Sequence, residues 1–218
     1  MRFGHILLAG LIGLAGCVSG KSSDLNGPET PLADDGTPCI ADRDAFMAMD
    51  YWTFDQAPEG SQSVSRKPGC ELAKADLIRD YHAALRAKGE PVTHTFEQGT
   101  VTFSETGEVS LLYWHEGQVR AINGQTEAAI ALFRKSIKPA EASVMGWNEY
   151  VRASVAFLQG DRAALETERA NLAAIVPATN LNLGVVDGLI ACFRRSYKDA
   201  YGARECDRRP GRQPVSAP

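Results

Sequence analysis

Apolar side chains recur every three or four positions along most of this chain. Between residues 71 and 88 the recurring positions are Leu72, Ala75, Ile78, Tyr81 and Leu85. This spacing places them on one face of an α-helix, which Gly89 and Pro91 would end. The same period predicts helices over 42–51, 108–122, 126–137, 146–158, 162–175 and 181–200. We therefore expect an all-α fold, with the Gly-, Pro- and Ser-rich stretch 55–70 as a loop.

The segment 92–103 lacks this helical spacing. Val92-Thr93-His94-Thr95-Phe96 and Thr100-Val101-Thr102-Phe103 are rich in β-branched and aromatic residues, and Glu97-Gln98-Gly99 lies between them. Such a pattern is typical of a small β-hairpin. An extended loop fits the same residues.

Short breaker sequences divide the next helices into antiparallel pairs. Asn123-Gly124 separates 108–122 from 126–137, and Gly160-Asp161 separates 146–158 from 162–175. Connections this short leave consecutive helices side by side. The inward-facing positions predicted for the first helix are Leu112, His115, Val119 and Ile122. In the second helix of each pair, the last position predicted to face inward is Ile137 or Ile175, respectively.

The two pairs resemble the tetratricopeptide repeat, a family of stacked helix pairs with a period of about 34 residues. Gly124 and Gly160 lie 36 positions apart, and Trp114 and Trp147 lie 33 apart. The first pair also carries small residues at Gly117 and Ala129 and the aromatic Phe133, as that family does. The resemblance covers residues 108–176 and implies a short array of antiparallel helix pairs.

Several positions depart from the pattern of the family. Glu116 and Arg120 occupy positions where a leucine and a tyrosine are usual, and Tyr113 replaces a tryptophan. In the second pair, Arg169 falls where an aromatic residue is expected. A plain helical bundle is therefore the alternative architecture.

The resemblance implies a concave surface lined by the first helix of each pair. It places four side chains there: Trp114, Gln118, Trp147 and Tyr150. Exposed aromatic residues in a groove are typical anchors for a protein partner. The alternative is that these tryptophans pack in the core.

The first residues have the parts of an export signal. Arg2 and His5 precede an apolar run from Ile6 to Leu14, which is too short to cross a bilayer core of roughly 30 Å. Leu14-Ala15-Gly16-Cys17 then resembles the lipobox of bacterial lipoproteins. The resemblance implies cleavage before Cys17 and lipid on that cysteine. An ordinary secretory signal is the alternative, and Val18 favours the outer membrane if the source is Gram-negative.

Composition narrows the class of partner. The whole chain has a net charge of −4, and loss of Arg2 with the signal makes the mature chain −5. A nucleic-acid-binding domain is expected to be basic, so we expect no nucleic-acid partner. We predict a signal at 1–16, a lipid-anchored flexible tether at 17–38, a helical domain at 39–203 and a disordered basic tail at 204–218.

Four cysteines remain after the anchor, an even number that suggests disulfides in an exported protein. Of the three possible pairings, we predict the two local bonds, Cys39–Cys70 and Cys192–Cys206. Free, buried cysteines are the alternative.

No catalytic, cofactor-binding or metal-binding motif is present in the sequence. His115-Glu116 begins like a zinc-protease motif, but the second histidine would fall at Val119. We therefore expect no cofactor, no metal and no enzyme activity. The expected protein is an envelope lipoprotein, most simply at the outer membrane facing the periplasm, whose helical domain binds another protein.

Two other functions fit the same sequence. The first is a cell-envelope hydrolase with a dispersed site, for which the candidates are His82, His94, His115 and Glu116. Those groups would have to meet in one pocket. The second is a lipoprotein inhibitor or immunity protein acting against a toxic enzyme.

Overall fold

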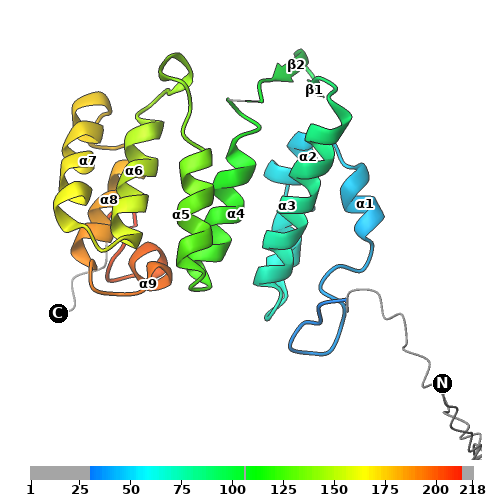
Figure 1. The fold of residues 1–218 in the computed structure, drawn as a ribbon, viewed down its shortest axis with the longest axis horizontal. Coiled ribbons are helices and arrows are strands. Elements are labelled where there is room, and N and C mark those ends of the chain that lie inside the picture. The colour runs from blue at the N-terminus through cyan, green and yellow to red at the C-terminus, as the bar shows by residue number, and fades with distance from the viewer. Residues whose placement is uncertain (1–29, 106, 213–218) are drawn as a thin grey trace, which may run out of the picture.

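The computed structural model describes residues 30–105 and 107–212, and these residues are mainly helical. Figure 1 shows the helices as a row of neighbours that run alternately up and down. The α-helices are α1 (Arg43–Ala48), α2 (Tyr51–Gln56), α3 (Glu71–Lys88), α4 (Leu111–Ile122), α5 (Thr126–Lys135), α6 (Trp147–Leu158), α7 (Arg162–Ile175), α8 (Leu181–Ala191) and α9 (Tyr197–Gly202). Two short 3₁₀ helices, η1 (Ser61–Arg66) and η2 (Ala140–Ala142), complete the helical elements of this part of the chain.

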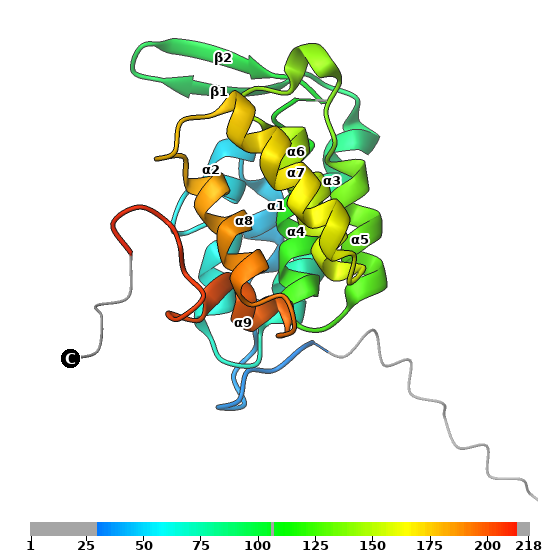
Figure 2. The same ribbon diagram turned by 90° about the vertical axis from the view of Figure 1, so that its left-hand side faces the viewer.

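Each helix from α3 to α9 packs against the next one in sequence. In the view of Figure 1, α8 and α9 lie behind α6, and the side view in Figure 2 shows the two as a second layer. The predicted mainly helical fold, the helix at 71–88 and the helix at 162–175 are confirmed.

The predicted hairpin at 92–103 is also confirmed. Strand β1 (Val92–Phe96) pairs antiparallel with β2 (Gly99–Phe103), so that His94 faces Val101 across the ladder. The hairpin lies beyond the upper ends of the helices in Figure 2. Trp52 of α2 packs against it, with ring centroids 5.0 Å from Phe96.

The core consists of two hydrophobic clusters that meet at α4. The first lies among α2, η1 and α3 and includes Phe54, which stacks on Tyr81. The second lies among α4 to α9 and includes Trp114 and Phe133. Because Leu112 belongs to the first cluster and Trp114 to the second, α4 is buried on two sides rather than on one.

This double burial corrects the predicted inward face of α4. The buried residues are Leu112, Trp114, Glu116, Gly117 and Ala121, whereas His115, Val119 and Ile122 are only partly buried. The buried carboxylate of Glu116 is compensated by Arg120, whose Nε donates to it at 2.7 Å. Arg120 Nη2 also donates to Asp76 of α3 at 2.9 Å. Burial raises the pKa of Glu116 against the opposing effect of Arg120.

Two helix predictions were wrong in their boundaries. The predicted helix 42–51 ends at Ala48, and a second helix begins at Tyr51, because the side chains of Asp42 and Asp50 accept from backbone N–H groups at the starts of α1 and α2. The predicted loop 55–70 contains the end of α2, residues 55–56, and the short helix η1. The predicted helix 181–200 ends at Ala191, and Ser196 caps a separate α9.

The folded part extends beyond the predicted tether and tail boundaries. Residues 30–38, predicted to be flexible, form a turn that lies on the domain: Ala33 is buried, and Asp34 N–H donates to Pro68 O at 3.0 Å. Residues 204–212, predicted to be disordered, also pack, with Cys206 fully buried. A Cβ on Gly184 would lie 2.7 Å from Arg209 Cα, so α8 needs a glycine here for this segment to approach. The predicted signal, the remaining tether and residues 213–218 lie outside the described residues.

Both predicted disulfides are present. Cys39 bonds to Cys70 and ties the start of the domain to the start of α3. Cys192 bonds to Cys206 and holds the C-terminal segment against the end of α8. The predicted local pairing is therefore confirmed.

Candidate functional site

Two of the four residues predicted to line a binding groove are in the core. Trp114 and Tyr150 are each only 3% exposed. Trp114 stacks on Phe133 at 4.3 Å and lies 4.8 Å from the Tyr150 ring, measured between centroids. The prediction that these two side chains anchor a partner was therefore wrong, and the alternative of core packing holds for both.

The C-terminal helix explains this burial. α9 packs against α4, and Tyr197 at its start lies 5.9 Å from Phe157 of α6 and 6.1 Å from Phe133. The segment from α8 onward thus covers α6 on the side where a repeat array would leave a concave face. The other two predicted groove residues differ in environment: Gln118 lines a cavity, whereas Trp147 is half-buried and donates its indole N–H to Ser136 O at 2.8 Å.

The three described histidines each face a different carboxylate. His94 Nδ1 lies 2.7 Å from Asp50, His115 Nδ1 lies 2.7 Å from Asp55, and His82 Nε2 lies 3.6 Å from Glu105. Glu116, the fourth candidate for a hydrolase site, pairs with Arg120. The cavity at His115 contains none of the other three candidates, so the structure does not bring this set together.

His82 is the most deeply buried of these histidines. It is 3% exposed, and its ring lies 4.3 Å from that of Tyr113. The 3.6 Å to Glu105 is too long for a hydrogen bond, so His82 Nε2 has no partner in the described residues. Burial lowers the pKa of His82 below its ordinary value of 6.5, although the charge of Glu105 opposes this shift.

We expect this burial to make the domain sensitive to acid. Because the folded state holds His82 neutral, its contribution is complete above pH 6.5 and is lost as the pH falls toward the lower pKa of the folded state. Urea unfolding from pH 7.5 to 5 should show a steeper loss of stability in the wild type than in His82→Gln. Parallel curves for the two proteins would contradict this role of His82.

The cavity beside His115 lies between η1, α3 and α4 and has a volume of about 240 Å³. Asp55 stands at its wall with a side chain only 1% exposed and accepts from His115 Nδ1. Burial lowers the pKa of Lys74, which also lines the cavity, while the attraction of Asp55 opposes that shift. The sequence did not point to Asp55, because it lies 60 positions from His115 along the chain.

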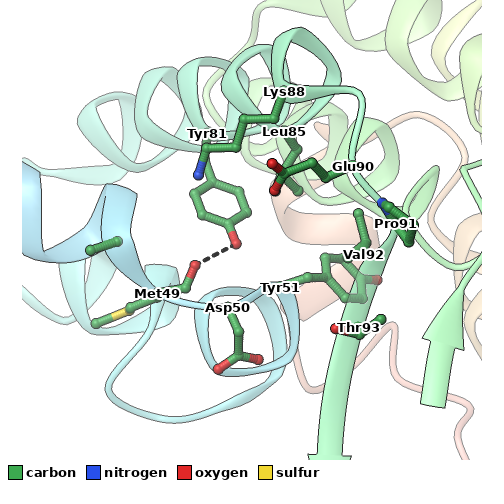
Figure 3. A pocket seen from close by; sticks show the side chains of 11 residues that line it. Met49, Asp50, Tyr51, Tyr81, Leu85, Lys88, Glu90, Pro91, Val92 and Thr93 are labelled. Atoms are coloured by element: carbon green, nitrogen blue, oxygen red, sulfur yellow. Dashed lines mark hydrogen bonds between the residues drawn. The ribbon is translucent and has the colours of Figure 1, made fainter. Parts of the chain in front are cut away.

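A second cavity lies between α2, the end of α3 and β1 (Figure 3) and has a volume of about 250 Å³. Tyr81 points across it and donates to Met49 O at 2.8 Å. Asp50, at its rim, is already bonded by Thr53 and His94. Burial alone would raise the pKa of Asp50, but these hydrogen bonds hold that pKa below its ordinary value. In this cavity, the hydroxyl of Tyr81 and the carboxylate of Asp50 therefore serve the fold.

Exposed apolar side chains gather on the side of the domain where one set of helix ends meets the hairpin. We call this the hairpin end: the hairpin, the start of α2 that packs on it, residues 137–146 between α5 and α6, and residues 175–181 between α7 and α8, most of it uppermost in Figure 1. Seven of the nine large exposed hydrophobic residues in the described chain lie there: Trp52, Val101, Ile137, Val144, Met145, Ile175 and Leu181. The other two, Leu32 and Leu72, lie at the opposite end, where α3 begins.

The hairpin end corrects two more predictions. Ile137 and Ile175, expected to face inward, are 38% and 57% exposed because each lies at or beyond the end of its helix. Met145 is 60% exposed and has a positive φ of 54°, which is unusual for a residue other than glycine. The backbone therefore holds Met145 in a costly conformation while its side chain remains in solvent.

Comparisons with known proteins give no family assignment. No protein-family model matches the chain, and neither a curated protein nor a solved structure is significantly similar to it. In the described residues, no three His, Cys, Asp or Glu side chains form a group able to hold a metal ion. No helix in that part of the chain has the length and hydrophobicity needed to cross a bilayer.

Proposed function

We propose that this protein is an envelope lipoprotein, held by lipid on Cys17, whose helical domain binds a protein partner through the hairpin end. The observation that carries the binding proposal is the placement of seven of nine large exposed hydrophobic residues at that end. Apolar side chains that cluster on a surface commonly mark an interaction site. Trp52 and Met145 belong to residue types that are enriched in such interfaces.

The course of the chain supports the same orientation. Residues 30–38 lie at the end opposite the hairpin (Figure 1), with Leu32 bridged to Pro38 there. A lipid anchor at Cys17 would therefore join the domain at the end away from the hairpin. The proposal places the outer membrane below that end and leaves the hairpin end open to a partner in the periplasm.

We also propose that α4–α5 and α6–α7 are two units of a tetratricopeptide-like array. The close approach of α4 and α5 supports this, since a Cβ on Gly117 would lie 2.7 Å from the Phe133 ring. Gly124 and Gly160 have φ of +76° and +69° at the two turns between helices. In this array, the segment from α8 to residue 212 acts as a cap that fills the concave side.

The anchor is tested by changing the cysteine. Cys17→Ser should abolish incorporation of labelled fatty acid and leave the unprocessed chain with its signal attached. Mass spectrometry of the wild type should find a diacylglyceryl group and an acyl chain on Cys17. An unmodified N-terminus at another residue would overturn the lipoprotein proposal.

The binding surface is tested by placing charge on it. Val144→Asp combined with Met145→Asp should weaken partner affinity about tenfold or more, because a carboxylate would be buried unpaired in the interface. The measurement is the sedimentation of the complex extracted in mild detergent. Leu72→Asp, at the opposite end and 38% exposed, is the matched control and should leave the complex intact. Equal effects from both variants would contradict the assignment of the surface.

A further inference from the structure

The cavity at His115 is lined mainly by polar side chains. Its polar lining residues are Asp55, Ser61, Gln62, Lys74, His115 and Gln118. They come from η1, from two long helices and from the end of α2, so the cavity has a fixed wall on each side. A cavity with several converging polar groups suits a ligand that has hydrogen-bonding groups of its own.

The one carboxylate in the wall is fully engaged. Asp55 Oδ1 accepts from His115 Nδ1 at 2.7 Å, and Oδ2 accepts from Gln56 Nε2 at 2.5 Å. Since a carboxylate only accepts, Nδ1 of His115 carries a proton. The other ring nitrogen, Nε2, is then held in one orientation by a buried group, and His115 remains 32% exposed toward solvent.

Lys74 supplies a positive charge without a fixed partner. Its ammonium is attracted by Asp55, but it forms no hydrogen bond with the described residues. Partial burial makes this charge costly, and an anion beside it would offset the cost. Ser61, which is 2% exposed, and the amide of Gln118 add neutral polar groups around the same space, whereas Gln62 Nε2 donates to Asp55 O at 3.5 Å.

We propose that this cavity binds a small ligand through a carboxylate or phosphate group, with Lys74 as the charged contact and His115 as a hydrogen-bonding partner. The volume of about 240 Å³ is below the range of roughly 300–1,000 Å³ typical of pockets for drug-sized molecules. It therefore suits a small metabolite or the anionic end of a longer one. The apolar part of the ligand would contact Val119 and Ile122, which complete the lining.

The test is a titration of the full chain in detergent with sodium acetate, inorganic phosphate and sodium chloride, at constant pH and ionic strength. The side-chain NMR signals of His115 report on the cavity. We expect a saturable shift with acetate, with phosphate or with both, and none with chloride. Acetate alone would assign a carboxylate ligand, and phosphate alone a phosphorylated one. No saturable shift with either anion, or the same shift with chloride, would overturn the proposal.

Variants of one helix separate binding from folding. Lys74→Met should weaken the affinity for the anion roughly tenfold or more, because a charged hydrogen bond is lost. Lys74→Arg, which keeps the charge, should retain binding. Lys88→Met, in the last turn of the same helix and at the other cavity, is the matched control. If Lys74→Met melts at the wild-type temperature and binds the anion as well as wild type does, the assignment fails.

Discussion

Trp114→Ala should destabilise the domain by about 3–5 kcal/mol, the usual cost of truncating a buried tryptophan. The side chain is 3% exposed and fills the space between the rings of Phe133, Trp147 and Tyr150. Its removal would leave a cavity between the two helix pairs. The loss is measured by urea unfolding of the full chain, with circular dichroism as the signal.

Trp52 provides the matched control for this experiment. It is 37% exposed at the hairpin end, so Trp52→Ala should cost less, about 1–2 kcal/mol from lost contact with the hairpin. The effects on partner binding should be reversed. Trp52→Ala should weaken the partner complex directly, whereas Trp114→Ala should reduce binding only by unfolding the domain. Similar stability losses for both would contradict the buried position of Trp114.

Loss of the Cys39–Cys70 disulfide is the second change with a large expected effect. The bond closes a loop across a sequence separation of 31, for which chain entropy predicts a contribution of about 3–4 kcal/mol. Cys39→Ala with Cys70→Ala should lower the free energy of unfolding by that amount. It should also release residues 30–38 from α3, because Cys39 is what joins this segment covalently to the helix.

Local protease sensitivity distinguishes this outcome from general unfolding. In the double variant, cleavage near Lys67 should accelerate more than cleavage at Lys198 in α9. Cys192→Ala with Cys206→Ala is the matched control, since it should reverse that preference by loosening the C-terminal segment instead. Uniform acceleration in both variants would show that neither bond acts locally.

Local sequence patterns predicted most of the elements. Strong apolar periodicity predicted α3 and α7, and the β-branched residues on either side of Gly99 predicted the hairpin. The cysteine pairing followed from the short loops that local bonds close. In each case the determining interactions lie within about thirty positions, so they are visible along the chain.

Long-range contacts account for what the sequence did not predict. The pattern of α4 was misinterpreted because Glu116 and Arg120 look solvent-exposed until Asp76 of another helix is placed beside them. The groove was misassigned because α9, far along the chain, packs against the face that a repeat would leave open. The role of Asp55 is likewise evident only from its contact with His115.

The clustering of apolar residues at the hairpin end also depends on the fold. Trp52, Met145 and Leu181 are scattered in sequence, and only the alternation of up and down helices brings their segments to one end. Single exposed apolar residues are ordinary in any protein. Their concentration at one end is what supports a docking surface there.

Site-specific photo-crosslinking in intact envelopes tests the central claim most directly. A photoreactive residue is placed in turn at Trp52, Val101, Met145 and Leu181 of the hairpin end, and at Leu32 and Leu72 of the opposite end. The proposed function predicts one shared protein adduct at hairpin-end positions and none at the other two. Adducts of equal yield at both ends, or only at Leu32 and Leu72, would contradict it.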